Sequence, residues 1–131
     1  MSWQAQVRRL SSVFAALALA MTTGLSAYAA HGAEGADQAR LYSAAIMLAV
    51  HGLGLLSLAR YRPELLFSLV RLGVMLGALL FCGSLVAAVF LQFRPWLAPA
   101  GGSMLMLSWL LAGLALWRGQ ASKERGDGDQ D

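Results

Sequence analysis

The chain has 131 residues, of which 58% are hydrophobic and 13% are charged, and its net charge is +3. A soluble domain carries about 25% charged residues and under about 50% apolar ones, and a fold this small could not hide so much apolar surface from water. The basic residues flank apolar runs instead of forming one patch, which argues against a nucleic-acid-binding surface and favours a membrane protein.

Four apolar runs follow one another along the chain, at residues 10–30, 41–59, 72–91 and 99–117. Each is close to the roughly 20 residues that a helix needs to cross a bilayer. The joints between them are short, which makes successive helices antiparallel neighbours. We therefore predict an all-α polytopic membrane protein, a four-transmembrane-helix antiparallel bundle. Residues 118–131 are polar and are predicted to form a disordered cytoplasmic tail.

The first run could also be a cleavable secretion signal. Arg8 and Arg9 precede it, and Ala27-Tyr28-Ala29 has the A-x-A shape of a cleavage site. Against this, the apolar run is longer than the roughly 7–15 residues of a signal core. Its removal would also leave three spans, so residues alone favour a retained helix without excluding a leader.

The second joint leaves two arrangements open. The third helix could begin early, at Pro63, which would place Arg71 two turns inside it with its side chain reaching back toward the headgroups. Alternatively, residues 63–71 could form a short helix in the membrane interface, followed by the span.

Basic residues are distributed unequally between the two sides of the predicted bundle. One side, with both termini and the second joint, holds Arg8, Arg9, Arg60, Arg62, Arg71, Arg118, Lys123 and Arg125, whereas the other holds Arg40 and Arg94. The positive-inside rule then predicts a bacterial inner (plasma) membrane protein with both termini in the cytoplasm.

The two histidines are the first candidates for a polar site. His51 lies deep in the second run, where an ionisable residue is either a packing element or part of a proton or ligand pathway. Thr22 or Thr23, Ser84 and Ser108 are predicted at a similar depth. We expect His51 to point inward and to hydrogen-bond a hydroxyl or carbonyl of another helix, most often the first or third. His31, at the outer end of the first run, is expected to cap the helix or order the loop.

Small residues predict where helices meet. Ala16, Ala20, Gly24 and Ala27 form a stripe on the first run, and Gly73 and Gly77 form a G-x-x-x-G on the third. Such stripes let helix backbones approach closely. We expect them to pack the bundle internally, and the alternative is a homodimer face.

No catalytic, cofactor or metal site is predicted. Cys82 is the single cysteine, and every acidic residue lies outside the four runs, so no Ser-His-acid set or zinc cluster can be assembled. His31 and His51 differ in depth by roughly 15 Å, so they cannot share one haem iron within a chain.

Four stretches carry a resemblance to a known family: "SAYAAHG", "AVHGLGLL", "LLFCGSLVAAV" and "APAGGSMLMLSWLLAGL". In order and spacing they resemble the domain of unknown function 423 family, the YgdD-like small four-helix membrane proteins. The resemblance implies that the first span is retained and that the fold is a four-helix membrane bundle. The family has no established activity to transfer. We therefore expect a structural or accessory membrane protein that packs with itself or a membrane-protein partner, or alternatively a proton or small-solute pathway through His51.

Overall fold

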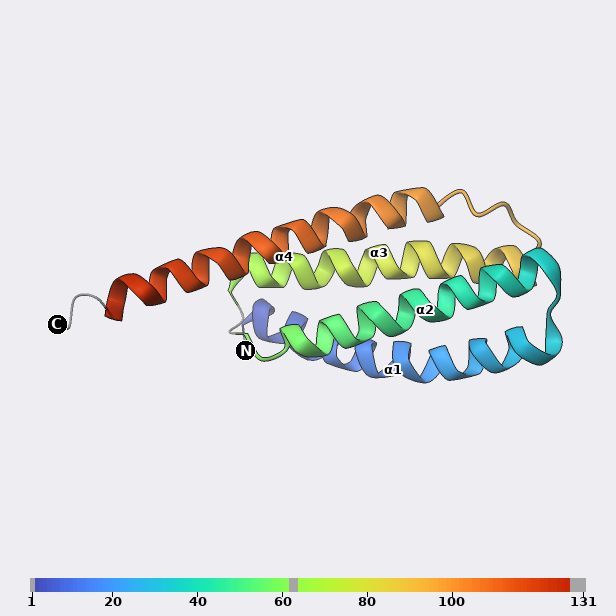
Figure 1. Cartoon of the computed structure of the whole chain (residues 1–131), viewed down its shortest axis with the longest axis horizontal. Coiled ribbons are helices and arrows are strands. Elements are labelled where there is room, and N and C mark those ends of the chain that lie inside the picture. Colours follow the sequence, from blue (N-terminus) through green and yellow to red (C-terminus); the bar gives the residue numbers. More distant parts are fainter. Residues whose placement is uncertain (1, 62–63, 128–131) are drawn as a thin grey trace.

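The computed structural model describes residues 2–61 and 64–127. It contains four α-helices: α1 (Trp3–Gly32), α2 (Gly35–Leu58), α3 (Leu65–Phe90) and α4 (Ala98–Asp127). They lie side by side in an up-and-down bundle (Figure 1). All four are long and apolar enough to cross a membrane, which confirms the predicted four-helix membrane architecture.

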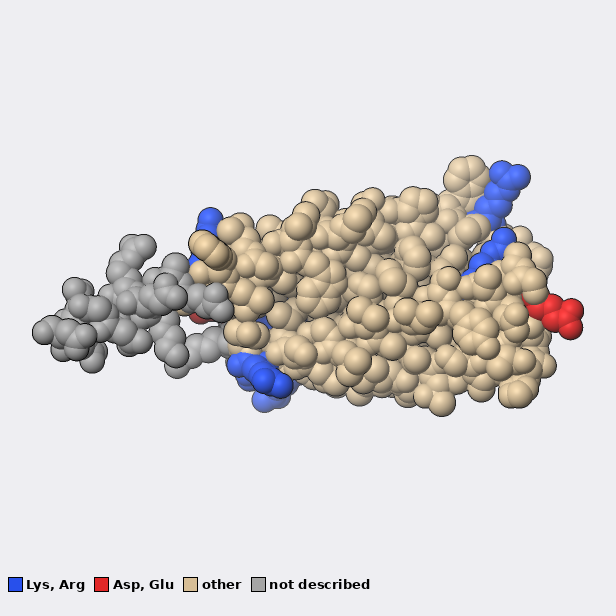
Figure 2. All heavy atoms as spheres, in the orientation of Figure 1, with Lys and Arg blue, Asp and Glu red and all other residues tan. Residues whose placement is uncertain are grey.

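Two names are used below for the ends of this bundle. The terminal end holds the start of α1 and the joint of residues 59–64 between α2 and α3. The far end holds the α1–α2 joint at residues 33–34 and the α3–α4 joint at residues 91–97. Charged side chains on the face seen in Figure 2 lie at these two ends, with none in the broad apolar middle. This is the charge distribution of a protein whose middle is surrounded by lipid.

The helices extend beyond the apolar runs that predict them. α3 begins at Leu65, so residues 65–71 belong to the third span and the separate interfacial helix is excluded, whereas Pro63 lies outside the described residues. α4 continues as a helix to Asp127, so residues 118–127 of the predicted disordered tail are helical, whereas residues 128–131 lie outside the described residues. Lys, Arg, Glu, Gln and Ala favour helix even without an apolar face, which is why hydropathy alone underestimates its length.

Helix ends are closed by local contacts. Ser2 caps α1, with its hydroxyl accepting from the backbone N–H of Ala5. At the far end the side chain of Gln38 donates to the carbonyl of Ala29 over 2.8 Å, which satisfies one of the free carbonyls of α1. Gly35 takes a left-handed φ of +57°, and this conformation lets a two-residue joint reverse the chain.

α3 is the central helix of the bundle. It packs against each of the other three helices, while α4 approaches the bundle backbone only along α3. The core of the terminal half draws on all four helices, whereas the core of the far half is built from α1, α2 and α3 alone. α4 is therefore attached along one seam, and its side away from α3 is a row of exposed apolar side chains that faces lipid.

Candidate functional site

Polar side chains inside the bundle are few, and they lie in two places. His51 and Ser108 lie in its middle, and Arg71, Ser68 and Ser11 lie toward the terminal end. A polar group removed from water and lipid headgroups is costly unless it is hydrogen-bonded, so its partners indicate what it does.

His51 points into the bundle, and only 6% of its surface is exposed. Its Nδ1 lies 2.6 Å from the carbonyl oxygen of Met47, one turn earlier in the same helix. A carbonyl can only accept, so Nδ1 carries the proton. The expected hydrogen bond to another helix is therefore wrong, because the backbone of α2 itself provides the acceptor.

The neighbour of His51 on another helix is Trp109 of α4. The two ring centroids lie 6.0 Å apart with the ring planes tilted by 45°. The indole also lies against Gly54, where an added Cβ would overlap it. His51 and Gly54 are three residues apart and share one face of α2, so together they form the surface on which Trp109 packs. The first and third helices were expected as neighbours, and no feature of sequence spacing indicates this contact with the fourth.

Small residues form the seam between α3 and α4. A Cβ on Gly73 would overlap the hydroxyl of Ser108, and one on Gly77 would lie 3.0 Å from the carbonyl oxygen of Gly101. The hydroxyl of buried Ser108 donates to the carbonyl of Met104 in its own helix over 2.8 Å. The structure thus places Gly73, Gly77 and Ser108 in one close helix contact.

Gly24 and Thr23 do not face the bundle. Both are exposed, and a Cβ on Gly24 would meet nothing within 4 Å, so the expected packing of Gly24 inside the bundle is wrong. The adjacent Thr22 faces inward instead. Its hydroxyl lies 3.0 Å from the carbonyl of Ala18 and 3.2 Å from that of Ala45, and the second contact links α1 to α2. The sequence places two threonines side by side, and only packing decides which one turns inward.

The rest of the small stripe on α1 is also exposed. Ala16, Ala20 and Ala27 lie with Gly24 on the outer surface, so internal packing by this stripe is wrong. The inward face is a different one, built from buried residues that include Ser11, Ala15, Ala18, Leu25 and Ala29.

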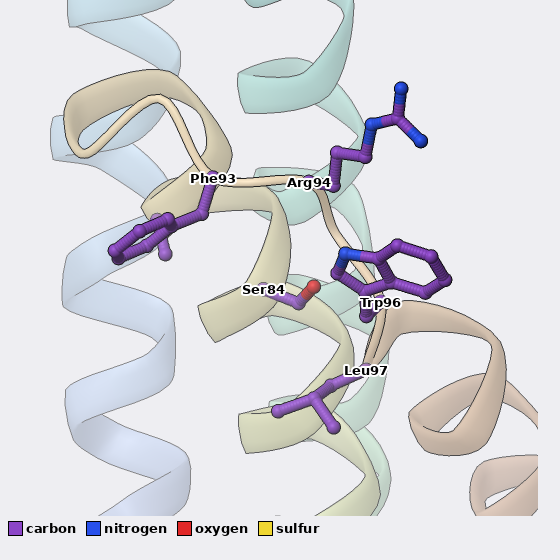
Figure 3. A pocket seen from close by; sticks show the side chains of 6 residues that line it. Ser84, Phe93, Arg94, Trp96 and Leu97 are labelled. Atoms are coloured by element: carbon purple, nitrogen blue, oxygen red, sulfur yellow. The ribbon is translucent and has the colours of Figure 1, made fainter.

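His31 and Ser84 belong to the far end. His31 is exposed in the last turn of α1, well away from His51. Ser84 lines an open pocket of about 280 Å³ between α3 and the α3–α4 joint, together with Ala87, Phe93, Arg94, Trp96 and Leu97. In Figure 3 the guanidinium of Arg94 points away from this pocket while the indole of Trp96 lies over it. Its walls are mostly apolar, and an aromatic and a basic residue at a span's end are typical of the lipid headgroup level.

Arg71 is the largest fully buried side chain, and it lies inside the third helix, as the first of the two predicted arrangements has it, but its enclosure was not predicted. Its Nη2 donates to the carbonyl oxygens of Leu58, at 2.7 Å, and Tyr61, at 3.1 Å. Leu58 is the last residue of α2, so Arg71 caps the negative end of that helix dipole and ties the joint to α3. The sequence signal for this capping role is a charged residue within the first turns of a span. Whether that residue is buried depends on how α2 ends.

Only one nitrogen of the Arg71 guanidinium, Nη2, has partners. Nε and Nη1 are buried without a hydrogen bond, and so is the hydroxyl of Ser68, one turn earlier on α3. The ion pair that the described residues do form joins Arg40 to Asp37 at the opposite end. Among the described side chains no carboxylate pairs with Arg71, and the positive charge of Arg8 repels its guanidinium.

No cluster of three or more His, Cys, Asp or Glu side chains occurs among the described residues. Cys82 is buried, and its thiol lies 3.5 Å from the carbonyl oxygen of Ala44, where it joins α3 to α2. Thr22, Arg71 and Cys82 thus connect helices to each other, whereas His51 and Ser108 bond carbonyls of their own helices.

These features define a small multi-pass membrane protein, a four-helix bundle with an apolar girdle and polar links between its helices. Residues 25–102 match the family described as protein of unknown function (DUF423), and because the match covers more than half of the chain, the chain belongs to this family. The match runs from the end of α1 to the start of α4 and includes His51, Ser68 and Arg71. Neither the curated proteins nor the solved structures contain a match to this chain.

Proposed function

We propose that this protein is a structural or accessory component of the bacterial inner membrane, with both termini in the cytoplasm and no enzymatic activity. It acts through helix packing, with a second copy of itself or with another membrane protein, and lipid is its surrounding medium. A proton or small-solute pathway through His51 is the alternative.

The environment of His51 is the observation that carries the proposal. A group that relays protons needs a changing partner, such as water or an ionisable side chain, on each side of it. The imidazole instead donates to a backbone carbonyl and packs against the Trp109 indole, with 6% of its surface exposed. This favours packing over a pathway.

The orientation is supported by the basic residues. Arg8, Arg9 and Arg60 belong to the terminal end, and Arg118 follows the span at the same end, whereas the far end has Arg40 and Arg94. Arg40 is moreover paired with Asp37. Positive charge near the ends of spans favours retention on the cytoplasmic side.

The stripe of small residues on the outer surface of α1, which contains Ala20 and Gly24, is the surface on which self-association is to be tested. Small side chains allow close approach between helices in lipid, and here the bundle itself does not use them. A cysteine placed at Ala20 should then form a disulfide between copies in native membranes, while one at Leu107, an exposed position on α4, should not. Equal cross-linking at both positions would mean random collision.

A flux measurement separates the two functions. Purified protein is placed in vesicles that carry a pH gradient and an internal pH-sensitive dye, with protein-free vesicles and the variant His51→Leu as controls. We expect the gradient to decay at the protein-free rate in both protein samples. Faster decay that depends on His51 would overturn the packing proposal.

A further inference from the structure

Ser68 differs from the other buried serines of the bundle. Ser11 donates to the carbonyl of Arg8 over 2.8 Å, and Ser108 donates to that of Met104. This back-bonding is the usual way for a hydroxyl inside a helix to satisfy its donor. Ser68 is equally buried, and its hydroxyl has no partner at all. A hydroxyl that does not donate to a carbonyl one turn earlier in its own helix is free to donate to a group from outside the chain.

Arg71, which has two unpaired guanidinium nitrogens, follows this serine by one turn of α3. Ser68 and Arg71 are three residues apart and share one face of α3. Nε and Nη1 of Arg71 are unpaired, and the guanidinium is fully enclosed. Its two present partners are carbonyls, which carry partial charges, so the full positive charge is not balanced. Removing an ion from water is unfavourable unless a counter-charge accompanies it.

None of the acidic side chains that the structure describes forms an ion pair with Arg71. Glu64 precedes α3, and its side chain is exposed and in no ion pair. Arg8, the charged residue whose field reaches the guanidinium, repels it. Uncompensated positive charge with free N–H and O–H donors is a site for an anion.

The depth of the Arg71 guanidinium in the membrane indicates which class of anion lies within its reach. α3 has 26 residues and is therefore about 39 Å long, so it exceeds the roughly 30 Å hydrocarbon layer and its ends reach the headgroups. Arg71 lies six residues after the first residue of α3, and its side chain reaches back to the carbonyls that end α2. The guanidinium thus lies near the boundary where lipid phosphates are found.

We propose that Arg71 and Ser68 form a binding site for a phosphate group of net negative charge at the terminal end of the bundle. Arg71 supplies Nε–H and Nη1–H, Ser68 supplies its hydroxyl, and Nη2 stays on the carbonyls of Leu58 and Tyr61. Because Arg71 and Ser68 are both fully buried, the anion has to displace the side chains that cover them. The phosphate comes from an anionic phospholipid or from free inorganic phosphate.

The test uses the purified full-length protein in a mild detergent, with native mass spectrometry to measure bound lipid. Phosphatidylglycerol, with net charge −1, is compared with phosphatidylcholine, a zwitterion, at equal concentration. We expect preferential retention of phosphatidylglycerol by the wild-type protein. Ser68→Ala should weaken this retention by about tenfold, the order expected for one hydrogen bond to a charged group. Ser108→Ala, the matched buried serine, should leave it unchanged.

A second pair of variants separates the site from general surface charge. Arg71→Gln should abolish the preference, whereas Arg9→Gln, an exposed arginine of the same end, should preserve most of it. Equal retention of both lipids by the wild type, together with no stabilisation by phosphate beyond that by chloride, would overturn the proposal, and these measurements stand even if Arg71→Gln does not fold. A preference that survives Ser68→Ala and Arg71→Gln would also overturn it, as adsorption to the surface.

Inorganic phosphate distinguishes the two sources. If millimolar phosphate displaces phosphatidylglycerol and raises the unfolding temperature while equal ionic strength of chloride does not, free phosphate is the ligand. If it does neither while the lipid preference depends on Ser68, the ligand is the lipid headgroup. Stabilisation that is equal for phosphate and chloride, with no lipid preference, would mean that water fills the site and the proposal is wrong.

Discussion

The seam between α3 and α4 allows a sharp comparison between two adjacent glycines. A Cβ on Gly101 would lie 2.5 Å from the backbone nitrogen of Phe81 and 2.7 Å from the carbonyl oxygen of Gly77. A Cβ on Gly102 would meet only the ring of Phe81, at 3.7 Å, which is an ordinary contact. The variants Gly101→Ala and Gly102→Ala therefore differ in what the same methyl group encounters.

Backbone atoms cannot rotate away, so α4 must retreat from α3 by about 1 Å to admit a methyl group at Gly101. Overpacking of this kind costs about 1–3 kcal/mol. Each substitution also favours helix by up to about 1 kcal/mol, and this gain is the same at both positions. We expect Gly102→Ala to be as stable as the wild type or slightly more stable. Gly101→Ala should be less stable than Gly102→Ala by about 1–3 kcal/mol.

Equilibrium unfolding in mixed micelles, with sodium dodecyl sulfate as the denaturant and tryptophan fluorescence as the signal, measures this difference. Because α4 joins the bundle backbone along α3 alone, the loss should appear as early detachment of α4. If Gly101→Ala proves as stable as Gly102→Ala, the close approach of α4 to α3 at this position is wrong.

Further predictions concern topology, processing and one interhelical bond. A cysteine replacing Gly35 should react with an impermeant thiol reagent outside intact cells, whereas one within residues 118–131 should not; the reverse pattern would invert the orientation. Mass spectrometry of the purified protein should find residues 2–29 present, because they form most of α1, and a mature chain that starts at residue 30 would restore the leader interpretation. Thr22→Val should destabilise the bundle by about 0.6–2 kcal/mol through loss of the α1–α2 bond, while Thr23→Val at an exposed position should have almost no effect. Equal effects at Thr22 and Thr23 would contradict the inward orientation of Thr22.

Helix number and membrane character follow from composition along the chain. Four apolar runs with short joints leave few alternatives, because a lipid-exposed backbone must satisfy its own hydrogen bonds within helices. Family membership could also be predicted, from the order and spacing of short motifs. The ends of the helices were harder to predict from the sequence, as the continuation of α4 to Asp127 shows. Hydropathy identifies the part of a helix inside the membrane, but it does not indicate where the helix ends outside it.

Faces and partners depend on the tertiary structure. In lipid an apolar residue is equally suited to the outside and the inside of a bundle, so hydrophobic periodicity carries little information about which side faces inward. This is why the stripe with Gly24 lies outside while Gly73 and Gly77 lie in a seam, and why Thr22 faces inward beside an exposed Thr23.

The polar site shows the same division. The sequence by itself determined that His51 is an ionisable residue deep in a span and that Arg71 lies near the start of one. Only the packing of α4 decided that Trp109 covers His51, because the two residues lie on helices distant in sequence. Likewise, only the way in which α2 ends beside α3 decided that Arg71 is enclosed, because its acceptors are backbone carbonyls, which every residue has and no sequence pattern distinguishes.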